Sequence, residues 1–454
     1  MPNPHLRLTS RSEDALTAAL AAIPASLGLT REFPPFDLPH PALPDTDLTA
    51  LPFVTVDPEG ATDLDQAFLL ERAGEGYRVR YAIAHVAAFV EPGGVLDAEA
   101  RRRGQTIYAP DGRIPLHPPE ISEDAASLLP GVVRGAYVWD FALDADAAVA
   151  NVSLGLARIR STAQLTYETV ADPLLEEIGE KRIALERARG GASLTLPETE
   201  IEAHDGRYGI VRRQPLPAEA WNAQLSLMTG MAAAEIMLAA GIGILRTMPE
   251  ADTAAIERFR LQAEALGHPW PADQPYGEYL RDLDTTDARG LAIMTAAASL
   301  FRGAGYTPFD GAAPDVTEQA AVGAPYAHTT APLRRLVDRF VLAACEALAN
   351  GRPVPSWVRD ALPELPALMS ASSAIAGQVD RLALDTVEAA MLTARVGETF
   401  DATVVSAREK SATIQLADPP VSATCEGSLE AGSRVRVRLD AADIATATVR
   451  FSVA

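Results

Sequence analysis

The chain has 454 residues, of which 48% are hydrophobic and 22% are charged. Such a chain is long enough for two to four globular domains with substantial cores. Lys and Arg number 39 against 61 Asp and Glu, a net charge of −22. This balance excludes a broadly basic protein, so any path for nucleic acid must be a local basic channel in an acidic exterior. Cys345 and Cys425 provide neither a disulfide framework nor a metal knuckle, and they fit a reducing, cytoplasmic location.

The N-terminal 50 residues predict a small helical unit. Ser10 or Ser12 can cap a helix that reaches Ile23, and a second short helix is expected over 25–33, which together would make a helix-turn-helix-like unit. Glu13 lies directly before the apolar stretch, so we expect no signal peptide. Six prolines between Pro34 and Pro52 predict an extended strap.

The stretch Phe53–Phe68, FVTVDPEGATDLDQAF, organises the rest of the chain. Its β-branched and aromatic start predicts a strand, and the proline and glycine that follow predict a turn. Four carboxylates then fall within nine positions. Oxygen-rich clusters of this kind suit magnesium or manganese, and two such ions can clamp the oxygens of a phosphodiester. A solvated acidic turn is the alternative interpretation. The four residues are Asp57, Glu59, Asp63 and Asp65.

The stretch from Leu96 to Pro130 carries a basic helix and a loop tyrosine. Asp97–Arg103 is expected to be helical, and its three consecutive arginines either contact an RNA backbone or form a solvated basic face. Tyr108 lies in a proline-containing loop, where it is either a rigid platform for a nucleic-acid base or a core residue.

The stretch Gly323–Ala344 predicts an anion site. Pro332 is expected to open a helix at its first turn, where Arg334, Arg335 and backbone N–H groups can converge on a phosphate. A salt-bridged helix arginine is the alternative, and Asp338 is expected to hold one of the two arginines.

Two more regions complete the expected architecture. The apolar run Leu225–Leu245 could be a membrane span, but it carries Glu235 near its centre, so we expect a buried helix and no membrane association. Short alternating strands between Val396 and Phe451 predict a five-stranded barrel of the OB type.

Three of these motifs resemble the ribonuclease II and ribonuclease R family, whose catalytic part is the RNB domain. The family motif is an apolar-Thr-apolar-Asp strand followed by Asp-x-Asp-Asp-Ala, and Asp57, Asp63 and Asp65 match three of its four aspartates. The fourth position is Gln66, whose amide oxygen can still bind a hard cation without adding charge. The resemblance implies metal ligands at Asp57, Asp63, Asp65 and Gln66, and catalytic roles for the three aspartates.

The other two motifs carry over further roles. Arg334 matches the arginine that clamps the scissile phosphate, and Tyr108 matches the aromatic residue that stacks on a base and sets the final product length. Gln224 and Gly230 stand where the family has Glu and Asn, and a second base-clamping aromatic is expected near 187–202 without a residue to assign. The RNA-binding residues that the resemblance implies are Arg103, Tyr108, Tyr167, Tyr326, His328 and Arg335.

The resemblance therefore implies an α+β protein with an RNB catalytic domain, in which helices surround a mixed sheet. We expect an N-terminal unit over 1–50, the catalytic domain over 51–394 and the C-terminal RNA-binding barrel over 395–454. The implied activity is a magnesium-dependent, or manganese-dependent, 3′-to-5′ exoribonuclease that converts single-stranded RNA to nucleoside 5′-monophosphates. We expect a monomer.

Two alternatives stay open. Gln66, Gln224 and Met248 depart from the family pattern and motivate an RNA-binding protein with weak or lost hydrolysis. A calcium-stabilised loop in an unrelated hydrolase is the other, although the spacing of glycine and aspartate does not match an EF-hand.

Overall fold

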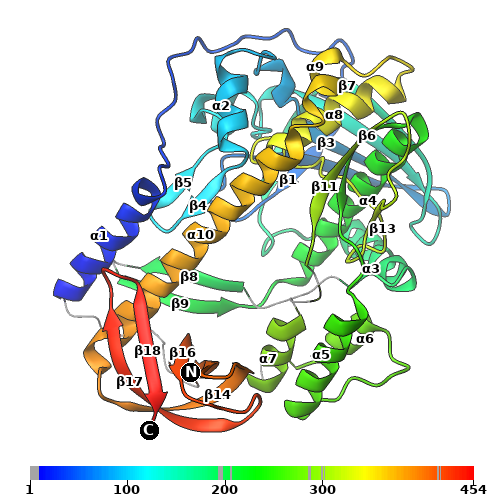
Figure 1. The fold of residues 1–454 in the computed structure, drawn as a ribbon. Coiled ribbons are helices and arrows are strands. Elements are labelled where there is room, and N and C mark those ends of the chain that lie inside the picture. The colour runs from blue at the N-terminus through cyan, green and yellow to red at the C-terminus, as the bar shows by residue number, and fades with distance from the viewer. Residues whose placement is uncertain are drawn as a thin grey trace.

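The computed structural model describes residues 10–192, 198–204, 207–284, 288–297, 300, 302–416, 419 and 421–454. These residues form two closed β-barrels with helices around and between them, which confirms the α+β class (Figure 1). The long helix α10 (Leu365–Leu392) runs diagonally through the molecule and contacts elements of both halves (Figure 1).

The first barrel carries the acidic stretch. Its strand order is β1-β2-β3-β6-β7, with β1 parallel to β7 and antiparallel to β2, so the sheet is mixed. Strand β3 does not pair with β1. A tight turn at Gly74, whose φ is +62°, folds β2 and β3 into a hairpin, and β3 then pairs with β6. The strands are β1 (Phe53–Val56), β2 (Gln66–Ala73), β3 (Gly76–Ala84), β6 (Val133–Leu143) and β7 (Val149–Leu165).

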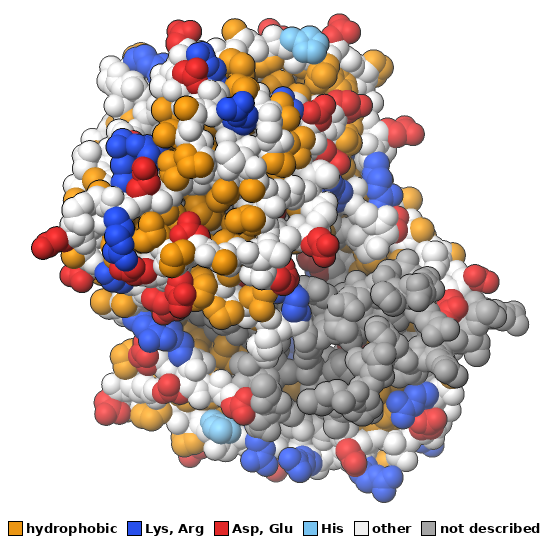
Figure 2. All heavy atoms as spheres, turned by 180° about the vertical axis from the view of Figure 1, so that it is seen from behind, with side chains coloured by type: hydrophobic (Ala, Val, Ile, Leu, Met, Phe, Trp, Pro, Cys, Tyr) orange, Lys and Arg blue, Asp and Glu red, His pale blue; other side chains and the backbone are white. Residues whose placement is uncertain are grey.

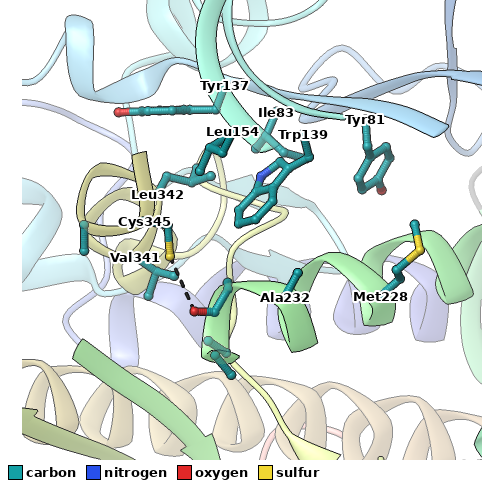
Figure 3. Close-up of a cluster of buried hydrophobic side chains, with 14 of the residues drawn as sticks. Tyr81, Ile83, Tyr137, Trp139, Leu154, Met228, Ala232, Val341, Leu342 and Cys345 are labelled. Carbon is teal, nitrogen blue, oxygen red and sulfur yellow. Dashed lines mark hydrogen bonds between the residues drawn. The ribbon is translucent and has the colours of Figure 1, made fainter. Parts of the chain in front are cut away.

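The main core lies between this barrel and two helices, α4 (Pro217–Ala240) and α8 (Leu336–Ala349) (Figure 3). In this view Tyr81 from the barrel lies above Met228 on α4, Trp139 lies nearer Ala232, and all four side chains are buried. Cys345 on α8 donates a hydrogen bond from Sγ to the Ala233 carbonyl at 3.6 Å, which fixes the two helices against each other. Burial of this many large apolar side chains is the main stabilising contribution to the fold.

Helix α4 is long and apolar enough to span a membrane by length and composition alone. Half of its most apolar window is buried inside the fold, where it contacts α8, α3 (Pro173–Ala188) and β10 (Ile242–Thr247). The prediction of a buried helix is therefore confirmed.

The remaining elements between the barrels are short. A helical cluster with its own core is formed by α5 (Thr253–Ala265), α6 (Tyr276–Arg281) and α7 (Ala288–Ala297). The others are the short helices Val86–Ala88, Ile121–Ala125 and Thr393–Arg395, α9 (Ser356–Ala361), and the strands β8 (Glu198–His204), β9 (Arg207–Arg213), β11 (Gly305–Asp310), β12 (Glu318–Gln319) and β13 (Ala324–Pro325).

The N-terminal helix α1 (Ser10–Ser26) packs along α10 and beside a small hairpin (Figure 1). This hairpin consists of β4 (Ile107–Ala109) and β5 (Gly112–Ile114), and it follows helix α2 (Val95–Arg103). The second helix expected over 25–33 is not formed, since the chain leaves α1 through a turn and continues extended. Pro34 excludes helical geometry at Phe33, which stacks under the Arg103 guanidinium at 3.8 Å instead.

The C-terminal barrel closes in the order β14-β15-β16-β18-β17, which confirms the predicted five-stranded OB-type barrel. Its core includes Phe400 and Phe451, whose rings meet edge to face with centroids 5.8 Å apart. The strands are β14 (Thr399–Ala407), β15 (Ser411–Leu416), β16 (Ser422–Glu426), β17 (Arg434–Asp443) and β18 (Thr448–Val453).

Acidic and basic side chains are intermixed on the face in Figure 2, outside the atoms drawn in grey. Many arginines are paired with carboxylates at the surface, as Arg78 is with Asp140 at 2.6 Å and Arg359 with Asp310 at 2.6 Å. Such pairs leave little net positive field, so affinity for a polyanion has to come from particular unpaired cations.

Candidate functional site

The acidic loop between β1 and β2 is held at both ends. At its start, the Asp57 N–H donates to the carbonyl of Leu165 at the end of β7, at 3.1 Å. Further along, Leu64 is fully buried, and its N–H donates to Ser127 Oγ at 2.9 Å. The loop therefore has little freedom, and its aspartates keep fixed positions.

Three aspartates of this loop are close enough to affect one another's ionisation. Burial, and then the charge of Asp63, raise the pKa of Asp57 to about 7, although Arg334 acts in the opposite direction. Burial also raises the pKa of Asp65 well above its ordinary range against the lowering effect of Arg334. Carboxylates gathered in this way favour a cation among them.

The arrangement fits a divalent metal in part. Asp57 Oδ2 is buried and has no hydrogen-bond partner, which is the type of oxygen that a cation satisfies. Among the described residues, no three His, Cys, Asp or Glu side chains converge closely enough to hold a metal ion as they stand. Magnesium commonly keeps several waters and binds one or two carboxylates together with substrate phosphates, so these aspartates can supply a partial ligand set.

Arg113 on β5 reaches into the acidic loop, and the sequence analysis missed it. Its guanidinium forms an ion pair with Asp63, donates to Thr62 Oγ1 and lies 2.9 Å from a Glu123 oxygen. Arg113 is also the cross-strand partner of Tyr108 in the hairpin, so both side chains leave the same face. That pairing is the one local signal that could have placed Arg113 at the site.

Gln66 makes two side-chain hydrogen bonds to other parts of the fold. Its Nε2 donates to the Thr330 carbonyl at 2.6 Å, and its Oε1 accepts from the Tyr81 hydroxyl at 2.6 Å. Tyr81 lies 2.9 Å from Ser226 Oγ on α4, so a chain of hydrogen bonds links β2, β3, α4 and the segment before α8. Gln66 therefore fastens these elements together, and its role as a metal ligand stays a prediction.

Asp65 joins the acidic loop to the arginine motif. It is 4% exposed, and its Oδ1 accepts from the Leu333 N–H at 2.7 Å. Its Oδ2 lies 3.8 Å from Nε of Arg334, whose side chain is 43% exposed. Arg334 is therefore oriented by Asp65 and still open to an anion from solvent.

Arg335 is placed differently from its neighbour. Helix α8 begins at Leu336, and Pro332–Arg334 form a turn, so the prediction that Pro332 opens the helix was wrong. Asp338 accepts two hydrogen bonds from Arg335, at 2.9 and 2.8 Å, as expected for one of the arginines. Arg335 thus fixes the turn from inside, and only Arg334 faces outward.

Tyr108 and Arg103 differ in solvent exposure: the tyrosine is exposed and the arginine is buried. Tyr108 is 54% exposed, and it is within electrostatic reach of Asp63, Asp65 and Arg334. Arg103 is buried, and it donates to Glu99 and to the carbonyls of Pro115 and Glu32. The predicted RNA contact at Arg103 is not supported by this placement, because its donors serve the fold. The residues that hold Arg103 are on α2 and in the segments around it.

Three predicted RNA-binding residues line the inner side of the site. Tyr167 is half-buried, and burial and the nearby charge of Asp57 raise its pKa. Tyr326 is 8% exposed, and its ring meets His328 edge to face at 5.6 Å. His328 Nδ1 lies 2.7 Å from the Tyr306 hydroxyl, and burial lowers the His328 pKa well below its ordinary value, so the imidazole is neutral.

Gly230 on α4 explains one departure from the family pattern. A Cβ at this position would lie 2.1 Å from Cε2 of Tyr326, so glycine is needed for the ring to pack here. The expected second aromatic falls near 187–202, of which residues 193–197 lie outside the described residues.

Comparison with known proteins assigns both barrels. Residues 45–350 match the RNB domain, and residues 398–454 match the RNase II-type exonuclease C-terminal S1 domain. Ribonuclease R of Escherichia coli is 30% identical over 321 residues, which cover 64% of this chain and 39% of that protein. The chain spans less than half the length of the curated relatives it matches first.

Two solved structures share the fold. Mycoplasma genitalium RNase R, in complex with ribose-methylated single-stranded RNA, superposes with a TM-score of 0.84 at 17% identity over 97% of this chain and 78% of that one. Yeast Ssd1, described as a pseudonuclease, superposes with a TM-score of 0.70 at 16% identity over 93% of this chain and 57% of that one.

Proposed function

This chain belongs to the RNB-domain exoribonuclease family, and we propose that it hydrolyses single-stranded RNA from the 3′ end, releasing nucleoside 5′-monophosphates. The exposed, oriented Arg334 beside the aspartates supports phosphodiester chemistry at this site. We propose a strand of RNA entering past the exposed ring of Tyr108, against which a terminal base can stack.

In this proposal the aspartates bind metal and Arg334 binds the phosphate. Asp57, Asp63 and Asp65 would hold magnesium or manganese, which supplies a Lewis acid and an activated water. Arg334 binds two phosphate oxygens through its planar guanidinium and offsets the charge that develops on them. Asp65 fixes the turn that presents Arg334, so the arginine is aimed before RNA arrives.

One observation carries this proposal. The Leu333 N–H donates to Asp65 across 268 positions of sequence, and it brings the acidic loop and the arginine motif into one site. A buried carboxylate with a raised pKa, next to an open guanidinium, is an arrangement found at functional sites more than in structural ion pairs.

The test is cleavage of a 5′-labelled single-stranded RNA a few tens of nucleotides long, with magnesium, with manganese and with chelator. A metal-dependent ladder that ends in a short product and mononucleotides supports the proposal. Asp65→Asn retains the shape of the side chain and should abolish the ladder, and Arg334→Ala should slow it by about 100-fold to 1000-fold. Asp140→Asn, at an exposed ion pair with Arg78, is the matched control and should leave the rate unchanged.

A second candidate is an RNA-holding protein with little hydrolysis. It is favoured by Gln66, whose amide is engaged with Thr330 and Tyr81 and brings no fourth carboxylate to the site. Ssd1 shares the fold, so the fold by itself does not require hydrolysis. Retention of intact RNA under all three conditions, with affinity that falls as salt rises, would select this candidate.

A further inference from the structure

We propose that Arg113 is a built-in cation that competes with divalent metal for Asp63, and so sets the metal concentration at which the site fills. The inference rests on the proposed function, because it concerns how metal reaches that same site. Its starting point is geometric: the guanidinium pairs with Asp63, the middle aspartate of the acidic loop. An arginine stays protonated at all ordinary pH values, so the pairing is not relieved by deprotonation of the guanidinium.

The arginine is placed there by a supported hairpin. Arg31 donates from Nη2 to Asp111 at 2.8 Å and from Nε to the Arg113 carbonyl at 3.2 Å. Behind the hairpin, Ile107 and Ile114 are buried against α1 and α10 (Figure 1). Because the hairpin is held from two sides, Arg113 stays close to Asp63 even when a metal ion displaces it from the carboxylate. The arginine therefore competes with metal at a high local concentration.

Glu123 is a second ion-pair partner for Arg113. Its Oε2 lies 2.9 Å from Arg113 Nη2, and it accepts from Thr62 Oγ1 at 3.2 Å. When metal takes Asp63, the guanidinium can keep its bond to Glu123 and does not become an unpaired buried charge. The side chain of Arg113 is 27% exposed, so water can reach the exchanging groups.

The consequence is a metal affinity below that of the free carboxylates. The positive charge of Arg113 repels a cation that approaches Asp63, and the guanidinium has to give up its ion pair before the metal can bind that carboxylate. Removing the charge of Arg113 should therefore tighten metal binding, whereas removing an ordinary structural ion pair would not.

The experiment measures manganese binding by the full chain, without RNA, from the loss of the free-ion signal in electron paramagnetic resonance. Arg113→Gln should bind manganese about tenfold more tightly than the parent. Arg113→Lys keeps the charge and should bind manganese more weakly than Arg113→Gln. Arg359→Gln removes an exposed arginine from its pair with Asp310 and should leave manganese affinity unchanged. Circular dichroism confirms that each variant is folded.

Each outcome decides something different. Equal affinities of the parent and Arg113→Gln, with binding abolished by Asp57→Asn, would overturn the competition and leave the proposed function intact. Binding by neither protein would overturn the competition, and the cleavage assay on single-stranded RNA tests the proposed function separately. Tighter binding by Arg113→Gln supports the competition, whether or not the protein then cleaves RNA. Glu123→Gln gives a further check, since it should weaken binding in the parent more than in the Arg113→Gln background.

Discussion

Replacing Gln66 with Glu tests whether this side chain is a fastener or a metal ligand. The two side chains have the same shape, but an ionised Glu has no hydrogen to donate to the Thr330 carbonyl, which Gln66 Nε2 reaches at 2.6 Å. The other oxygen can still accept from Tyr81. The substitution therefore removes one hydrogen bond and places a carboxylate oxygen next to the Thr330 carbonyl oxygen, so that two acceptors face each other.

The magnitude follows from that geometry. The lost hydrogen bond costs about 1 kcal/mol, and leaving the Thr330 carbonyl without a donor costs about 1–3 kcal/mol more. Thr330 is buried, so water does not replace the donor. A protonated Glu restores the donor, so the pKa of the new carboxyl is raised above its unfolded value. Its penalty is then absent at low pH and grows as pH rises through the folded pKa.

Urea unfolding in chelator, followed by tryptophan fluorescence, measures the difference. Gln66→Glu should match the parent near about pH 4 and lose about 2–4 kcal/mol near about pH 8. Gln214→Glu, at an exposed position, is the control and should stay within about 0.5 kcal/mol of the parent at both pH values. If Gln66→Glu is as stable as the parent near about pH 8, and manganese stabilises it more than the parent, then position 66 is a metal-ligand position and its hydrogen bonds do not hold the fold together.

Three other predictions concern the surroundings of the site. Burial raises the pKa of Glu388 from 4.5 to about 7 despite the hydrogen bond from the Ser422 N–H, so the parent should lose about 3 kcal/mol of stability as pH rises between these values. Glu388→Gln should flatten that dependence in thermal unfolding, and an unchanged profile would contradict the assignment. Gly104 has a φ of +71°, and a Cβ there would lie 2.5 Å from the Ser372 Cβ. Gly104→Ala should therefore destabilise the protein by about 1–3 kcal/mol in urea unfolding. Unchanged stability would show that α10 moves to make room for the added methyl group. Tyr108→Ala should weaken single-stranded RNA binding by about 1–3 kcal/mol in fluorescence anisotropy, whereas equal affinity would place the base elsewhere.

The parts of the site that are local in sequence could be predicted from it. The strand Phe53–Val56 and its three following aspartates form a continuous pattern, and the structure has this strand with the same bounds. Helix α2 and the C-terminal barrel likewise follow from short-range periodicity. These elements need no knowledge of what lies opposite them in the fold.

The parts that depend on distant partners could not be predicted. Gln66 matched a metal-ligand position, and only its contact with Thr330, 264 positions away, shows that its amide is occupied. Arg103 was one of three similar arginines, and its burial against Glu32 and Phe33 depends on the path of the residues before Pro34. Arg113 reaches Asp63 across 50 positions through a hairpin whose placement is set by α1 and α10. Motif matching assigns a position its usual chemistry, whereas tertiary contacts decide whether its atoms are free.

The charges at the site determine how far the acidic loop depends on a bound cation. When all three aspartates are ionised they contribute −3, and Arg113 and Arg334 contribute +2, which leaves −1 in a partly buried region. A site with a fourth carboxylate and no Arg113 would carry −3, and mutual repulsion would then destabilise it wherever no cation was bound. Gln66 and Arg113 therefore act in the same direction, since each reduces the need for metal to keep the acidic loop folded. The same two residues also reduce the attraction of the site for metal. They therefore stabilise the acidic loop when no cation is bound, and they lower its affinity for the ion.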